Sequence, residues 1–466
     1  MIAKSLNSWI CSALCVATAA WTFTVDANLS SAEAESLRRA LARAYLKNPQ
    51  LGAERARQRA TDEEVPQALS GWRPTVTANG DYGYLRDKVV TTRSRTSNGR
   101  EPRGYSITLN QPVFEGMRTY FGTLQAEANV NAGRQTLLNV QQTVLLDGVT
   151  SYMNVIRDRT IVSLRRKNVA VLKEQLRASQ ARFNVGEITR TDVAQARARL
   201  SQSQSNLAVA KSNLAASAAF YVRVFGVKPR KLYYPKRTLA RMPKSLKSAV
   251  RIADQQNPTV LAASFTEIAA RYAIKVARGN LLPTLSVQAQ FSRRERDSTT
   301  LLRNEQGTVV GSLTVPLYQA GTVYSQIRQA KQTANQRRLQ ILDARRQVRQ
   351  NVVTSWNNII AAHEAIRAAR EQVSANELAF SGVKQEALVG SRTTLDVLDA
   401  EQELVDSRVS LVQAQRELIV ARYQLLASIG RLTANDLNLG INRYDPKANY
   451  LRVRDKLFGG DINESE

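Results

Sequence analysis

The chain has 466 residues, of which 43% are hydrophobic but only 6% aromatic, and this composition favours long helices over a compact mixed domain. Its formal net charge of +27 is of the size that proteins use to bind polyanions. The basic residues are spread through the helical segments, however, and the chain opens with an export signal, so we expect no nucleic-acid partner.

The first 27 residues have the features of a cleaved signal peptide. Lys4 precedes a largely apolar run, and Val25-Asp26-Ala27 has the form of a signal-peptidase site. The alternative is a retained membrane anchor, but the apolar run is short and interrupted by threonines. Both cysteines, Cys11 and Cys15, lie in this segment, so the mature chain is expected to have no thiol for a disulfide or a metal site.

The rest of the chain is an internal duplication. Asn48-Pro49 recurs as Asn257-Pro258, and Asp192-Val193 recurs as Asp396-Val397, so the offset stays at about 204 to 209 residues. We therefore expect a first repeat over 28–226, a linker over 227–243, a second repeat over 244–434 and a C-terminal segment over 435–466 with a disordered end.

Each repeat predicts a helix, two strands and two long helices. The strands are expected at about 74–86 and 104–113 in the first repeat, and at about 284–294 and 307–316 in the second. Apolar and polar residues alternate along them, which is the pattern of transmembrane barrel strands of about ten residues. Because helices flank each hairpin at both ends, the two connecting loops are expected on the far side of the membrane, outside the cell.

The first of these loops, Arg86 to Arg103, is strongly basic. Its basic residues are Arg86, Lys88, Arg93, Arg95, Arg100 and Arg103, against Asp87 and Glu101. A loop in this place would face anionic lipopolysaccharide in the outer membrane. The alternative is an ordinary charged surface loop.

About 70 residues of helical pattern follow the strands in each half and end at Gly186 or Gly390, which predicts a helix of roughly 105 Å. The next helix has a strict seven-residue repeat, with small residues three positions after the first four large ones in each half. The large residues are Val193, Leu200, Leu207, Leu214 and Tyr221 in the first half, and Val397, Leu404, Leu411, Leu418 and Leu425 in the second. This period predicts left-handed supercoiling and close helix packing.

Four strands cannot form a closed barrel, and open sheet edges are not tolerated in hydrocarbon, so several chains are expected to share one barrel. Two chains would supply about eight strands and three about twelve. A barrel of about eight strands is filled by side chains, so a transport role favours three chains, although the sequence alone leaves the number open.

The order and duplication of these features resemble the TolC family of outer-membrane channels, over about residues 30 to 440. The resemblance rests most on the paired phrases Phe183 to Val193 and Leu388 to Ala400. It implies a mainly α-helical homotrimer, with an α-helical barrel in the periplasm and a shared 12-stranded β-barrel in the outer membrane. It also implies a passive channel-tunnel that exports drugs, small molecules or proteins, together with a periplasmic adaptor protein and an inner-membrane transporter.

The resemblance further implies a gate at the periplasmic mouth. Gly186 and Gly390 would form the helix-to-helix turns, and a glycine there can adopt the left-handed conformation that ends a helix. Asp192 and Arg392 would link neighbouring coiled coils and hold the entrance shut. The family commonly has a tyrosine five residues before this arginine, where the present chain has Ala387.

The resemblance also assigns Asp396 and Asp399 to a ring of carboxylates at the constriction, where three copies of each would favour cations. The alternative reading of all these charges is that they are solvated helix ends, with Asp192 stabilising a helix N-terminus.

Enzyme signatures are absent from the sequence. His363 has no metal-ligand companion at helical spacing, and there is no Gly-rich phosphate loop, so we expect no enzyme activity, no metal and no cofactor. The alternative to a channel is a basic coiled-coil scaffold protein of the cell envelope.

Overall fold

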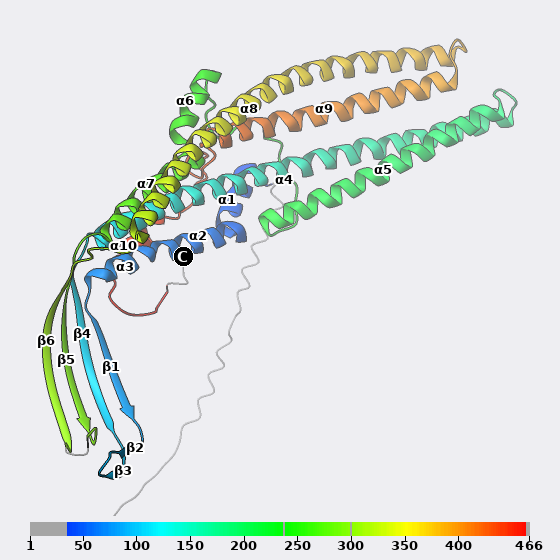
Figure 1. The fold of residues 1–466 in the computed structure, drawn as a ribbon. Helices are drawn as coiled ribbons and strands as arrows, with labels where there is room; N and C mark the ends of the chain where they lie inside the picture. The colour runs from blue at the N-terminus through cyan, green and yellow to red at the C-terminus, as the bar shows by residue number, and fades with distance from the viewer. Residues whose placement is uncertain (1–34, 236–237, 299–300, 463–466) are drawn as a thin grey trace, which may run out of the picture.

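The computed structural model describes residues 35–235, 238–298 and 301–462. The molecule is elongated, with a β-sheet at one end and two long helical hairpins reaching toward the other (Figure 1). The expected signal peptide lies outside the described residues, as do the last four residues of the C-terminal segment. Within the described residues, no helix combines the length and the apolar composition needed to cross a membrane.

The two halves of the chain repeat the same order of elements. The first half consists of α1 Leu37–Lys47, α2 Pro49–Asp62, α3 Glu64–Leu69, the 3-10 helix η1 Ser70–Trp72, β1 Thr75–Tyr82, β2 Leu85–Val90, β3 Arg95–Arg100, β4 Arg103–Glu115, α4 Arg118–Asn184 and α5 Arg190–Phe225. The second half consists of α6 Leu246–Gln256, α7 Pro258–Gly279, β5 Thr284–Glu295, β6 Arg303–Thr314, α8 Thr322–Leu388 and α9 Thr394–Ser428, and α10 Pro446–Val453 follows it. The long helices α4 and α8 each have 67 residues.

The bounds of the first and the last strand differ most from the sequence prediction. The first strand ends at Tyr82 instead of continuing to 86, and the segment expected to be a loop contains the small hairpin β2–β3, closed by a bond of 2.7 Å from Thr91 N to Ser94 O. The last strand runs from Arg303 to Thr314, not from 307 to 316. The first residues of this strand are charged and form ion pairs across the sheet. They do not follow the alternation of apolar and polar residues on which the prediction was based.

The four long strands form one antiparallel sheet in the order β1-β4-β5-β6. The central pair β4–β5 joins the two halves of the chain, and β1 and β6 form the edges. One face of this sheet is apolar and solvent-exposed. Its exposed apolar side chains include Val76, Tyr82, Tyr105, Ile107, Leu109, Phe291, Val309 and Leu313.

The repeated Asn-Pro motif has the same structural role in both halves. The Asn48 side chain accepts from Gln50 N at 2.9 Å, which caps α2, and donates to the Val224 carbonyl at 3.0 Å, near the end of α5. In the second half, Asn257 caps α7 and donates to the Ser428 carbonyl at 2.8 Å. Each asparagine therefore joins a short helix to the end of a long hairpin.

The main hydrophobic core joins α1, the middle of α4 and the end of α5 in the first half to α6, the middle of α8 and the end of α9 in the second half. Farther along the first hairpin, the small residues are the most buried. Ala196 and Ser203 are almost inaccessible, whereas Leu200 is only partly buried. Small residues at the contact let helix axes approach closely, as the heptad pattern predicted.

The segments outside the two repeats are also packed against them. In the linker, the Lys231 carbonyl accepts from Glu35 N at 2.8 Å, beside an isolated bridge to Leu232. In the C-terminal segment, Asn449 of α10 donates to the buried Asp62 carboxylate at 3.0 Å. Both segments therefore brace the start of the first repeat.

Candidate functional site

The two helical hairpins turn at Gly186 and Gly390, which both have a φ of +80°. A left-handed conformation at this angle favours glycine, and it lets the chain reverse within a few residues. The turns are closed by bonds of 2.9 Å from Glu187 N to the Arg182 carbonyl and of 3.0 Å from Ser391 N to the Glu386 carbonyl. Both glycines thus lie in the turns between α4 and α5 and between α8 and α9. These turns are the hairpin tips, at the opposite end of the molecule from the sheet (Figure 1).

A capping box begins the helix that follows each turn. In the first hairpin, Thr189 Oγ1 accepts from Asp192 N at 3.3 Å while the Asp192 carboxylate accepts from Thr189 N at 2.9 Å. Thr393 and Asp396 repeat this arrangement with distances of 3.2 and 2.9 Å. The hydrogen bonds from these threonines lower the pKa of both carboxyl groups, so Asp192 and Asp396 are ionised at neutral pH.

Arg392 is also held within its own hairpin tip. Its Nε donates to Glu386 at 2.9 Å, and this bond raises the pKa of the guanidinium further. Arg182 and Glu187 form the corresponding pair in the first hairpin. Within the described chain, Asp192 and Arg392 do not contact each other, so any link between them would have to form between different copies.

Asp399 lies between the two hairpins. Its carboxylate accepts a hydrogen bond from Arg199 of α5, so the pair joins α9 to the other hairpin. Two further contacts repeat this connection: Arg165 of α4 binds Asp406 at 2.7 Å, and Arg416 donates to Asn154 of α4 at 2.9 Å. We call these three contacts the inter-hairpin clasp.

The sequence prediction missed both Arg199 of the clasp and a buried carboxyl group, that of Glu401. It lies one helical turn after Leu398, which packs against Leu172 and Ala196 of the first hairpin, and only 7% of its surface is exposed. Burial raises the pKa of this carboxyl to about 7, and the charge of Lys384 only partly opposes the shift. A group with this pKa changes its charge near neutral pH.

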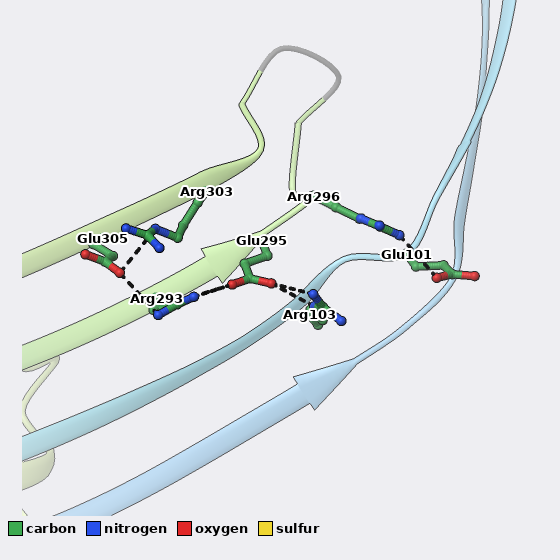
Figure 2. Close-up of polar contacts among 7 residues, drawn as sticks. All are labelled: Glu101, Arg103, Arg293, Glu295, Arg296, Arg303 and Glu305. Atoms are coloured by element: carbon green, nitrogen blue, oxygen red, sulfur yellow. Dashed lines mark hydrogen bonds and ion pairs between the residues drawn. The ribbon is translucent and has the colours of Figure 1, made fainter.

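The strand end of the molecule carries a second concentration of charge. Five side chains of alternating sign cross β4, β5 and β6 at the ends nearest the connecting loops (Figure 2). The hairpin β2–β3 lies beyond these residues, farther from the helices, and is basic (Figure 1). Its residues Arg100 and Asp87 form an ion pair at 2.8 Å. Charge is thus concentrated at both ends of the molecule.

Comparison with known proteins identifies the family. A family profile described as "Outer membrane efflux protein" matches residues 40–221 and 249–431, one segment in each repeat. The chain belongs to this family. It is therefore an outer-membrane protein of efflux or export, as its sequence predicted.

Curated relatives of this outer membrane efflux protein match along most of their length. Outer membrane efflux protein BepC of Brucella suis biovar 1 (strain 1330) is 37% identical over 430 residues, covering 92% of each chain. Outer membrane protein TolC of Escherichia coli (strain K12) is 28% identical over 435 residues, covering 88% of this chain and 85% of TolC. The alkaline protease secretion protein AprF of Pseudomonas aeruginosa is 24% identical over 375 residues, covering 77% of each chain.

Solved structures share the fold of this outer membrane efflux protein. The Campylobacter jejuni CmeC outer membrane channel superposes with a TM-score of 0.77 at 15% identity, covering 90% of this chain and 89% of CmeC. The open state of the Neisseria gonorrhoeae MtrE channel gives a TM-score of 0.70 at 15% identity, covering 85% of this chain and 89% of MtrE. The mainly helical, internally duplicated fold class is thus confirmed.

Proposed function

We propose that three copies of this chain form a passive channel across the outer membrane, continued by a tunnel of helices in the periplasm. The observation that carries this proposal is the four-stranded sheet, which has an exposed apolar face and two unpaired edges, β1 and β6. In hydrocarbon every backbone polar group needs a partner, so the edge of one copy has to pair with the edge of the next. About twelve shared strands would leave a lumen, whereas about eight would be filled by side chains.

The channel would need partners for its energy, since the chain carries no signature of an enzyme. We propose that a periplasmic adaptor protein docks on the hairpin tips and connects them to an inner-membrane transporter. Both tips expose apolar side chains, namely Val185, Leu388 and Val389, and exposed apolar side chains of this kind mark interaction sites. The names of BepC and AprF connect the relatives with efflux and with protease secretion respectively, so the cargo of this chain is either small molecules or proteins.

We further propose that Asp192 and Arg392 belong to a gate between copies and that Asp396 and Asp399 line the entrance. Asp192, Arg392 and Asp396 all lie within the tip, as such a role requires. The clasp makes the two entrance carboxylates unequal, because Arg199 neutralises Asp399 as long as the two hairpins of one copy stay in contact. Asp396 would then supply most of the negative charge at the entrance.

The basic loop Arg86 to Arg103 is proposed to face lipopolysaccharide. Neutralising its arginines should reduce retention of the channel in lipopolysaccharide-containing membranes, whereas unchanged retention would leave the loop as an ordinary charged surface.

Fractionation and electrical recording test the channel itself. The outer-membrane fraction should yield a heat-modifiable trimer band, and the purified trimer should conduct ions in planar bilayers. A water-soluble monomer would instead support the coiled-coil scaffold. A deletion strain scored for both drug sensitivity and loss of secreted proteins would then decide between the two cargo classes.

A further inference from the structure

The apolar face of the sheet ends in a chain of five alternating charges, which we call the arginine–glutamate ladder. Its members in order are Arg303, Glu305, Arg293, Glu295 and Arg103 (Figure 2). The successive closest N–O distances are 3.3, 3.5, 2.6 and 2.7 Å. Three separate strands contribute these residues, so the sheet fixes their spacing.

The strand register assigns the ladder to the apolar face. Arg103 is two residues from Tyr105 on β4, and Arg293 is two residues from Phe291 on β5, so each charge shares a face with an aromatic ring. The centroids of these two rings lie 6.2 Å apart. In a membrane-inserted sheet, aromatic side chains at the end of the apolar band mark the level of the lipid headgroups. The ladder therefore lies at or just above that level, on the side that faces lipid.

The opposite face carries the opposite balance of charge at the same height. There, Arg294 reaches across Gly104 to Asp81 at 3.6 Å and also contacts Asp297 at 3.2 Å. Arg294 and its two partners, Asp81 and Asp297, have a net charge of 1 − 2 = −1. The ladder has three arginines and two glutamates, a net charge of 3 − 2 = +1. The ladder therefore has the more favourable charge of these two sets for binding an anion.

The two ends of the ladder have hydrogen-bond donors to spare. The side chains of Arg103 and Arg303 are both 56% exposed, more than the three residues between them. Arg103 binds Glu295 through Nε and Nη2, and Arg303 contacts Glu305 through Nε. A guanidinium has five N–H donors in a rigid fork, so one carboxylate does not saturate it.

We propose that the ladder binds the phosphate groups of a phosphorylated lipid of the outer leaflet, with Arg103 and Arg303 as the donors to phosphate. Glu295 and Glu305 hold the guanidinium groups in position. A forked guanidinium matches phosphate oxygens in a bidentate geometry, and a charge pair at the headgroup level avoids the cost of placing an arginine deep in lipid. The inference rests on the proposed channel, because it requires the sheet to be inserted in a membrane.

Thermal unfolding of the purified trimer in neutral detergent tests this inference, with lipid A carrying two phosphates as the probe and fully dephosphorylated lipid A as its control. The test variant is Arg103→Gln combined with Arg303→Gln. The matched control is Arg294→Gln, which lies at the same height on the opposite face of the sheet. Arg93→Gln with Arg95→Gln, in the basic loop proposed above to face lipopolysaccharide, measures the share of the binding that the loop itself contributes. Phosphorylated lipid should stabilise the wild type and the Arg294→Gln control equally. Its apparent affinity for the test variant should be weaker by about tenfold or more, a larger loss than in the loop variant.

Two results would overturn the ladder proposal: an equal response of the test variant and the wild type, or equal stabilisation by the dephosphorylated lipid. Loss of the response in the loop variant alone would move the site to the loop and also contradict it. If the glutamine variant does not fold, Arg103→Lys with Arg303→Lys keeps the charge without the fork and should bind lipid more weakly than the wild type. A wild type that forms no conducting trimer would reject the channel itself, whereas a normal channel without a phosphate-dependent response would reject only the ladder.

Discussion

Arg199 and Asp399 form an ion pair that joins the two helical hairpins of a single protomer close to their tips. The pair connects α5 to α9, so any movement that separates the hairpins has to break it. Both side chains are partly exposed, with 40% and 50% of their surface accessible, so each pair contributes modestly. In a trimer the contribution would be present three times.

Replacing Arg199 with alanine should therefore favour the open entrance. An exposed pair contributes about 0.2–1 kcal/mol, so the loss of three pairs would change the equilibrium constant for opening by roughly 3-fold to 150-fold. Single-channel conductance in planar bilayers measures the change. Arg197→Ala is the matched control, because Arg197 is an exposed arginine two residues away on the same helix. Equal effects of the two substitutions would show that the clasp does not restrain opening.

Asp192 should act on the gate separately from its effect on helix capping. Asp192→Ala removes both the negative charge and the capping interaction, whereas Thr189→Val removes the hydroxyl and keeps the carboxylate. If Asp192 latches neighbouring copies, the first substitution should raise conductance and the second should leave it near the wild-type value. Similar increases in both variants would assign the effect to fraying of α5 instead.

Arg392 offers a test in the opposite direction. Glu386→Gln removes its partner in the same tip, which frees the guanidinium to bind a neighbouring copy. Conductance should therefore fall in Glu386→Gln and rise in Arg392→Ala, as measured in the same bilayers. A rise in both would mean that the pair only stabilises the turn.

The two entrance carboxylates should differ in their effect on ion selectivity. Because Arg199 neutralises Asp399 in the clasp, Asp396→Asn should reduce cation selectivity and divalent-cation block more than Asp399→Asn does. Arg199→Gln should increase cation selectivity, since it frees Asp399. Reversal potentials under a salt gradient measure both effects, and an equal loss in the two aspartate variants would contradict the role of Arg199.

Glu401 should make the contact between the hairpins pH-dependent. Its pKa is raised from 4.5 to about 7, so the packed state favours the protonated form. The contact is therefore strongest below pH 4.5, weakens as the pH rises from about 4.5 to about 7, and changes little above that. Backbone amides around Leu398 should be protected from hydrogen exchange at least about tenfold more at pH 5 than at pH 8, after correction for intrinsic exchange rates.

The Glu401→Gln variant should lose this dependence, because a neutral side chain cannot titrate. Glu403→Gln, two residues away and exposed, is the control and should behave as the wild type does. A wild-type protection profile that does not change between pH 5 and pH 8 would rule out the buried carboxyl as its cause.

The sequence predicted those parts of the fold that depend on local chemistry. The asparagines of the two Asn-Pro motifs cap the helices that follow them, and this capping depends only on the local sequence. Gly186 and Gly390 supply the left-handed conformation that a hairpin turn needs. Alternation likewise predicted the four long strands, except where Arg303 and Glu305 continue the strand with charged residues.

The contacts between hairpins could not be predicted in this way. The heptad pattern of α9 does not include Glu401 among its apolar positions, yet the residue is buried one turn after Leu398, which packs against the first hairpin. The pairing of Arg199 with Asp399 depends on how two coiled coils lie against each other, and neither residue is marked by a local motif. The sequence thus identified Asp399 but not the partner that neutralises it.

The equal lengths of α4 and α8, 67 residues each, constrain how this protein can change in evolution. Deleting seven residues from each arm of one hairpin would keep the heptad phase but shorten that hairpin by about 10 Å. The two hairpin tips of each copy would then end at different depths. Around the mouth of the assembly, long and short hairpins would alternate, so the tips would no longer form a level rim. Insertions and deletions should therefore be accepted only when all four arms change together.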